Sequence, residues 1–237
     1  MKRTLLVLLT ACVAPASSTT ITIMPATGIA SAVADRAAWL AANFDPDYSI
    51  NVTVTFENVP SAHYSTLATD VGTFSLAPGC QPGDPIRSLG DKSNQFAIFT
   101  TSNTPYIGRF NTTDGGNKWL DSNDLTELQL TTSLSDIYFF ITDVSDVDGL
   151  MRISTADGTT ATFPTGQPDG NIFFVGITSQ SPLGTVRWSD SSTHDGFGLD
   201  DFGRVNEWEP VPEPSAVPLL LLGMAYLLIK RARAGQA

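Results

Sequence analysis

Acidic side chains at short spacing are the residues of this sequence whose types and positions could do chemistry. Asp143, Asp146 and Asp148 follow an apolar segment and precede Gly149, which places three carboxylates at a strand end beside a turn residue. Carboxylate oxygens are the ligands that Ca²⁺ and other hard cations prefer, although the spacing here differs from the loop of an EF-hand. We therefore treat this loop as a candidate calcium site, with a solvated acidic turn as the alternative.

Two further clusters carry oxygen ligands of the same kind. One cluster consists of Asp195, Asp200 and Asp201, and the other of Asp121, Asn123 and Asp124. Each cluster could hold a hard cation through carboxylate or amide oxygens, and each could equally be a solvated acidic turn. Calcium is accordingly the one cofactor that the sequence brings into consideration.

Catalytic residues are not arranged in a recognisable set. His194 stands beside Asp195 and near Ser192, but adjacent residues on an extended segment point in opposite directions and cannot form a triad among themselves. The 24 acidic residues form many pairs, and glycoside hydrolysis depends on a separation in space that sequence does not reveal. We predict that the protein is not an enzyme. The alternative is an extracellular hydrolase acting on polysaccharide.

Trp119 is the candidate for stacking on a sugar ring. It follows the glycine-rich, polar segment 114–118, and loops of this composition usually lie at the surface. An exposed indole could pack against the C–H face of a pyranose, whereas most tryptophans belong to the core. Both interpretations stay open at this stage.

The charge distribution argues against nucleic acid as a partner. The whole chain has a formal charge of −11, and residues 17–213 carry all 24 acidic side chains against 8 basic ones, or −16. Such a surface repels phosphate backbones and attracts cations.

The N-terminus has the three regions of a secretory signal peptide. Lys2 and Arg3 precede a short apolar run, and small residues follow it up to Ala16. An alternative is a lipoprotein signal, because Leu-Thr-Ala-Cys ending at Cys12 matches the pattern that is cut and lipidated at cysteine. Removal of the signal peptide would leave Cys80 unpaired, which excludes an internal disulfide framework.

Most of the chain alternates with the period of a β-strand. Between residues 50 and 57 apolar and polar residues alternate, which predicts a half-buried strand. Further strand candidates are 71–76, 95–100, 106–110, 125–130, 137–142, 150–154, 159–163, 172–177, 185–188 and 202–205. Turn residues separate them, and the alanine-rich segment 30–43 predicts one short helix. The pattern predicts an all-β, antiparallel, jelly-roll-like β-sandwich with a short N-terminal helix.

The C-terminus predicts a membrane anchor. An apolar run over residues 216–229 would extend about 21 Å as a helix, which is short for the hydrocarbon core. It is nevertheless terminal, has no polar face, and is followed by Lys230, Arg231 and Arg233. Basic flanks of this kind stay in the cytoplasm. We therefore predict a transmembrane helix with its C-terminal end inside the cell.

The last 28 residues resemble the PEP-CTERM sorting signal, in which a Pro-Glu-Pro motif, a short hydrophobic helix and a basic cluster follow one another. The motif here is Val211, Pro212, Glu213 and Pro214. The resemblance implies recognition and processing by an exosortase, a membrane enzyme of Gram-negative bacteria. It also implies export, anchoring in the inner membrane before processing, and later release or attachment at the cell surface, often in bacteria that make exopolysaccharide.

Three internal segments resemble phrases in β-sandwich domains of PEP-CTERM proteins. They are 56–58, 108–113 and 195–202. The last is also similar to the closing strand of jelly-roll adhesion and carbohydrate-binding modules. This likeness implies a fold more than a function.

The sequence thus predicts three parts: a signal peptide at 1–16, a secreted β-sandwich domain at 17–209, and a sorting signal at 210–237. The expected function is that of an exported, exosortase-processed surface or extracellular-matrix protein with a structural or glycan-binding role. The expected partners are the exosortase, the membrane before processing, and exopolysaccharide.

Overall fold

The computed structural model describes residues 18–47, 49–83, 94–100 and 108–207. The predicted signal peptide with Cys12, the Pro-Glu-Pro motif, the predicted transmembrane helix and the basic cluster after it all lie outside these ranges. Among the described residues, no helix has the length and apolar character needed to cross a membrane.

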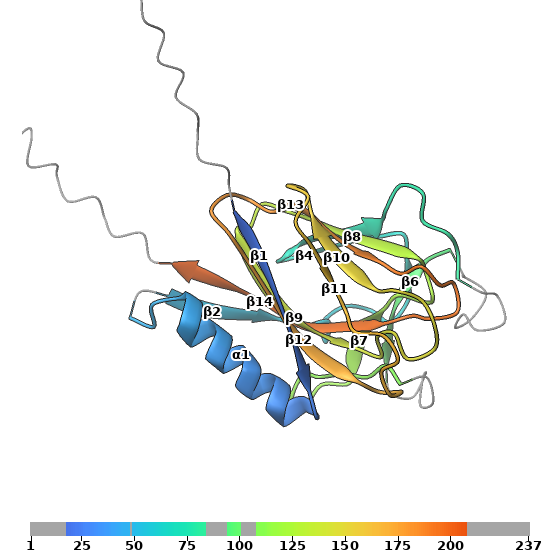
Figure 1. Ribbon diagram of the computed structural model, residues 1–237, viewed down its shortest axis with the longest axis horizontal. Helices are drawn as coiled ribbons and strands as arrows, with labels where there is room; N and C mark the ends of the chain where they lie inside the picture. The colour runs from blue at the N-terminus through green and yellow to red at the C-terminus, as the bar shows by residue number, and fades with distance from the viewer. Residues whose placement is uncertain (1–17, 48, 84–93, 101–107, 208–237) are drawn as a thin grey trace, which may run out of the picture.

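The described chain forms fourteen strands and one helix (Figure 1). Their bounds are β1 (Thr19–Ala26), α1 (Ile29–Asn43), β2 (Ser49–Val54), β3 (His63–Tyr64), β4 (Thr66–Thr69), β5 (Gly72–Leu76), β6 (Phe96–Thr100), β7 (Lys118–Asp121), β8 (Glu127–Thr132), β9 (Asp136–Thr142), β10 (Arg152–Thr155), β11 (Thr160–Thr162), β12 (Ile172–Ser179), β13 (Gly184–Ser189) and β14 (Gly198–Glu207).

These strands make two sheets whose described pairings are all antiparallel. The eight-stranded sheet has the order β1-β12-β9-β14-β7-β6-β3, with β2 paired to β14 beside this path. The six-stranded sheet has the order β11-β10-β13-β8-β5-β4. From β7 to β10, and again from β11 to β14, successive strands alternate between the sheets. The prediction of an all-β antiparallel fold with one short helix is confirmed.

The main hydrophobic core lies between the two sheets. Phe139 of β9 stacks on Phe202 of β14 with ring centroids 4.8 Å apart, and both belong to the larger sheet. From the smaller sheet, Trp188 of β13 meets Phe139 at 5.3 Å and Phe74 of β5 meets Phe202 at 5.3 Å. These rings join the two layers, so the fold is a β-sandwich with an apolar interior.

Strand β9 is buried on both faces because α1 covers the outer face of the larger sheet. Ile137, Phe139 and Ile141 point into the main core, whereas Tyr138 and Phe140 belong to a second cluster under the helix. A strand that is covered on both sides has no polar face, so apolar and polar residues do not alternate along it. This explains the nearly continuous apolar run of β9, and Figure 1 shows α1 lying along this side of the sandwich.

Gly176 of β12 leaves the space that Trp39 of α1 occupies. A Cβ atom at Gly176 would lie 2.2 Å from Cε2 of the indole, far inside contact distance. We expect Gly176→Ala to displace the ring and lower the free energy of unfolding by about 1–3 kcal/mol, the usual cost of overpacking. Urea unfolding checks this. The double variant with Trp39→Ala should lose less than the sum of the single losses, and strictly additive losses would contradict the clash.

Several strand assignments from the sequence need correction. Residues 108–110, the described part of the predicted strand 106–110, are not in a strand, because Arg109 turns inward to pair with carboxylates from other loops. Strands β1, β3, β4 and β7 were not predicted. Of these, β1 pairs with β12 along its whole length. Pro25 fits this strand because β1 is an edge of its sheet, where a missing N–H is tolerated.

Candidate metal centre

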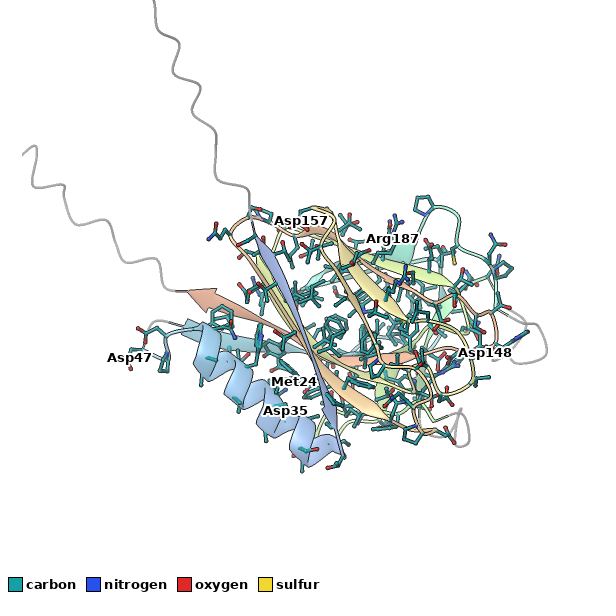
Figure 2. The ribbon with its side chains drawn as sticks, in the orientation of Figure 1. Met24, Asp35, Asp47, Asp148, Asp157 and Arg187 are labelled. Carbon is teal, nitrogen blue, oxygen red and sulfur yellow. The ribbon has the colours of Figure 1, made fainter. Side chains whose placement is uncertain are left out.

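Three carboxylates meet at the end of the sandwich where β9 ends and β12 begins. One oxygen from each of Asp143, Asp146 and Asp169 lies within 4.8 Å of the others. Asp143 is buried, Asp146 is half-buried and Asp169 is exposed, so the group runs from the interior to the surface. Figure 2 shows Asp148, from the same loop as Asp146, at the opposite end of the molecule from Asp47.

The loop after β9 is bent by residues in the left-handed region. Asp143 has a φ of 62° and Ser145 has a φ of 55°, a conformation that aspartate tolerates better than most residues because its short side chain can bond locally. Asp143 Oδ1 accepts the backbone N–H of Gly170 at 3.0 Å. This bond connects the loop after β9 with the loop before β12.

Asn171 holds these two loops together through both ends of its side chain. Its Nδ2 donates to the carbonyl of Val144 at 3.0 Å, and its Oδ1 accepts the Val144 N–H at 3.1 Å. Its backbone carbonyl also accepts the N–H of Asp143 at 2.9 Å. The positions of the Asp143 and Asp169 carboxylates therefore depend on a network of backbone and amide bonds.

Arg109 is the buried basic residue that lies next to Asp143 of this group. Its Nη1 donates to Asp121 Oδ1 at 2.9 Å and its Nη2 to Asp124 Oδ1 at 2.5 Å, while Nε lies 3.5 Å from Asp143 Oδ2. Burial lowers the pKa of Arg109, but the charges of the three aspartates outweigh burial and raise that pKa above its ordinary value. Arg109 is therefore charged, and both of its terminal nitrogens are engaged by aspartates, whereas Nε makes no hydrogen bond to a described atom. A Cβ at Gly196 would lie 2.2 Å from Nη2, so only glycine leaves room for the guanidinium.

The Asp143 carboxyl resists ionisation although Arg109 is close. Burial raises the pKa of Asp143 to about 7, and the charges of Asp146 and Asp169 add to this effect, against the Gly170 N–H and the Arg109 charge, which lower it. One guanidinium shared by three aspartates does not offset the cost of burying this carboxylate.

Asp195, in the loop before β14, adds a fourth carboxylate from the interior. The residue is only 1% exposed, and neither carboxylate oxygen receives a hydrogen bond from any described donor. Burial raises the pKa of Asp195 to about 9, and the nearby charges of Asp190 and Asp146 add to this rise against the lowering effect of the Arg109 charge. The Asp195 and Asp146 carboxyl groups are close enough to share a hydrogen bond if one is protonated. As two carboxylates, they only repel.

Asp148 lies in a neighbouring loop contact and not in the group of three. Its Oδ1 accepts the hydroxyl of Ser192 at 2.6 Å, and Asp190 Oδ1 accepts the Ser192 N–H at 2.7 Å. Burial raises the pKa of Asp190 to about 6, and the Asp148 charge contributes to this rise. These contacts are those of a turn that closes against the loop after β9.

Asp200 and Asp201 were grouped with Asp195 by sequence, and this grouping is wrong. Asp200 Oδ2 accepts the backbone N–H groups of Thr112 at 2.7 Å and Thr113 at 3.1 Å. Asp201 pairs with Arg36 of α1 at 2.6 Å. Both residues lie in β14, where the register shifts, and they fasten a loop and the helix to the sheet.

The other predicted site residues are also structural. Asp121 and Asp124 pair with Arg109, and Asn123 Nδ2 donates to the carbonyl of Gln95 at 2.9 Å. Trp119 is 0% exposed and packs in a small cluster with residues of β6, so it cannot stack on a sugar. The polar loop before it misled the interpretation, because β7 begins at Lys118 and carries the indole inward.

The structure thus brings together aspartates that belong to different clusters in the sequence. Asp143 and Asp146 belong to one predicted cluster and Asp195 to another, and they now lie at one end of the sandwich. Asp169 was not predicted. Its only local signal is the Pro168-Asp169-Gly170 turn before a strand, and turns of this kind are common in β proteins.

The geometry suits binding a hard cation better than cleaving a glycosidic bond. Glycosidases hold two carboxylates about 5–9.5 Å apart on either side of the bond. Here one oxygen from each of three carboxylates lies within 4.8 Å of the others, and a single ion can contact oxygens that are this close. A cavity of about 340 Å³ lies beside Asp148 and is lined by residues 191–194. There Ser192 bonds to Asp148 and accepts the backbone N–H of His194, again as in a turn.

No family model matches this sequence, and no curated protein matches it. Among solved structures, the chain is similar to the CBM22-1–CBM22-2 tandem domain of Xyn10C from Paenibacillus barcinonensis, with 11% identity and a TM-score of 0.32 over 70% of this chain and 47% of that one. It is also similar to the enzymatically active domain of tailspike protein 4 from bacteriophage CBA120, with 14% identity and a TM-score of 0.23 over 62% and 20%. The chain thus spans about half of the first structure and a fifth of the second. With TM-scores this low, neither likeness assigns a fold family or a function.

Proposed function

We propose that this chain is an exported structural protein of the cell surface or extracellular matrix, processed at its C-terminal sorting signal by an exosortase. The observation that carries the proposal is the position of the folded domain between two predicted targeting segments. Strand β1 begins at Thr19, just after the predicted signal peptide, and β14 ends at Glu207, just before the predicted sorting signal. Removal of both segments would leave every described strand in place.

The position of β14 in the larger sheet decides where the chain can be cut without damage to the fold. Strand β14 pairs with β9, β7 and β2, so it lies within the larger sheet and not at its edge. A cut inside β14 would destroy the sheet, whereas a cut at Pro212–Pro214 falls outside it. Two prolines around Glu213 favour an extended backbone that a processing enzyme could bind.

We favour a structural role over glycan binding. The aromatic residue expected to stack on sugar, Trp119, lies in the core. The acidic groups that converge have the spacing of ligands to one ion, so we also propose no catalytic role for them. We also propose that the sandwich is jelly-roll-like, because successive strands alternate between the two sheets.

Intact-mass measurement of the protein in a host with an exosortase tests the proposal. The extracellular form should begin after Ala16 and end between Val211 and Ser215. Pro212→Ala combined with Pro214→Ala should leave the chain in the membrane fraction, because the motif is lost. Pro210→Ala, a proline change just outside the motif, serves as the matched control and should be processed normally.

Two results would contradict this function. Recovery of only those chains that retain Ala237 would show that the tail is not removed. Release of reducing sugar from exopolysaccharide by the purified domain would replace the structural role with that of a hydrolase.

A further inference from the structure

We propose that Asp143, Asp146, Asp169 and Asp195 bind one Ca²⁺ ion at the end of the sandwich where β9 and β12 meet. This site does not depend on the proposed processing of the tail. It includes a residue from each of three loops that lie far apart in the sequence, those after β9, before β12 and before β14.

The carboxylate oxygens of the group are close enough to bind one ion together. Ligands that lie 2.3–2.6 Å from a Ca²⁺ ion are at most about 5 Å from one another. The three oxygens of Asp143, Asp146 and Asp169 already lie within 4.8 Å of each other. One ion could therefore contact all three with little movement of the loops.

The buried carboxylate of Asp195 points to a ligand independently of this convergence. Both of its oxygens lack a hydrogen-bond donor among the described residues, and the carboxyl groups of Asp190 and Asp146 both lie near them. A buried polar group without a partner is costly, and a buried charge without a counter-charge costs more. A cation bound between Asp146 and Asp195 would satisfy both carboxylates.

Arg109 does not fill this role. Its Nη1 and Nη2 atoms are engaged by Asp121 and Asp124, and its nearest approach to the group is the 3.5 Å contact between Nε and Asp143. Asp146, Asp169 and Asp195 form no ion pair with a basic side chain in the described part of the chain. A bound cation could therefore supply to these three carboxylates the positive charge that no described ion pair provides.

At Gly108 the backbone passes very close to two of these carboxylates. It has a φ of 77°, and a Cβ there would lie 1.9 Å from Asp143 Oδ1 and 2.2 Å from Asp169 Oδ1. Only glycine lets the chain approach these two oxygens so closely. Together with the Asn171 bonds, this packing holds the carboxylates in place before an ion arrives, which reduces the cost of binding.

The ligand types select calcium among the common metals. The described group contains carboxylates and no His or Cys, which disfavours zinc. Mg²⁺ requires a near-ideal octahedron at 2.0–2.1 Å, whereas Ca²⁺ accepts six to eight oxygens in irregular arrangements. Exposed Asp169 leaves one side open to water, which could complete such a shell.

Thermal unfolding of the purified protein in CaCl₂ and in EDTA tests the site. At a Ca²⁺ concentration about 100 times its Kd, the melting temperature should rise by about 5–10 °C, because the ion binds only the folded state. The same concentration of MgCl₂ should give a clearly smaller rise. Equal midpoints in CaCl₂ and EDTA would overturn the proposal.

Two variants locate the effect, and a third controls for charge. Asp195→Asn and exposed Asp169→Asn should each weaken Ca²⁺ binding at least tenfold in calorimetric titration. Asp195→Asn should not lower the melting temperature in EDTA, since a neutral amide removes repulsion from Asp146. Asp47→Asn removes one charge at the opposite end of the molecule (Figure 2) and should bind Ca²⁺ as the wild type does. Wild-type affinity in both site variants would overturn the assignment.

Discussion

Replacing Arg109 with methionine should lower the free energy of unfolding by about 3–5 kcal/mol, the cost of removing one partner from a buried ionic group. Methionine fills a similar volume but leaves Asp121 and Asp124 buried without a cation. Asp121 is already difficult to ionise, because burial raises its pKa against the lowering effect of Arg109. Urea unfolding, carried out in both CaCl₂ and EDTA, measures the loss.

Arg187→Met is the matched control for this experiment. Arg187 lies 3.8 Å from Glu127, and the two side chains are 39% and 28% exposed. Surface pairs of this kind contribute about 1 kcal/mol or less, so the variant should unfold near the wild-type midpoint. If Arg109→Met lowered the free energy of unfolding no more than Arg187→Met does, the buried guanidinium would not be needed to stabilise the surrounding aspartates.

Trp119→Ala should lower the free energy of unfolding by about 3–5 kcal/mol, the usual cost of removing a large buried aromatic ring. The indole is fully buried against Ala97 and Phe99 of β6, and its Nε1 donates to Asp121 Oδ2 at 3.4 Å. The substitution therefore leaves both a cavity and a weakened contact to the Arg109 network. Chemical unfolding with fluorescence of the remaining tryptophans follows the transition.

Val147→Ala is the control for a hydrophobic truncation at the surface. Val147 is 51% exposed, and surface substitutions usually change stability by less than about 0.5 kcal/mol. A Trp119→Ala variant that kept its stability but no longer bound exopolysaccharide would contradict the burial of this residue. It would support the stacking role that the sequence had suggested.

The strands were predictable where one face meets the core and the other meets water. In β8, Leu128 and Leu130 are buried while Glu127 and Gln129 are not, and the predicted segment 125–130 overlaps this strand. The same signal is present in β1, where Ile21 and Ile23 pack on the core and alternate with threonines. That strand was missed although its alternation was visible in the sequence.

The helix was predictable, but its role was not. An alanine-rich segment with Trp39 indicated a helix at 30–43, and α1 runs from Ile29 to Asn43. What the helix covers depends on β9 and β12, whose outer faces carry Tyr138, Phe140 and Phe174. The sequence pattern shows that a residue is apolar, but it does not show whether the side chain will lie in the main core or under the helix.

The candidate site was only partly predictable, because short spacing in the sequence is a poor guide to spacing in a sheet. Asp195, Asp200 and Asp201 lie close together in the chain, yet β14 begins at Gly198. Asp195 therefore stays in the loop at the end of the sandwich, while Asp200 and Asp201 lie in the strand. Trp119 is a similar case, since it is the second residue of β7, which begins at Lys118 directly after the polar loop.

The sequence alone determined the properties that contiguous residues carry: the alternation that makes strands, the turn residues between them, the acidic charge, and the terminal segments that predict export. Only the tertiary structure decided which acidic residues meet. Strands β9 and β12 pair although β10 and β11 lie between them in the chain, and this pairing brings Asp143 and Asp146 next to Asp169. Carboxylates converge when strands from distant parts of the chain become neighbours, and that choice is made by the packing of the whole core.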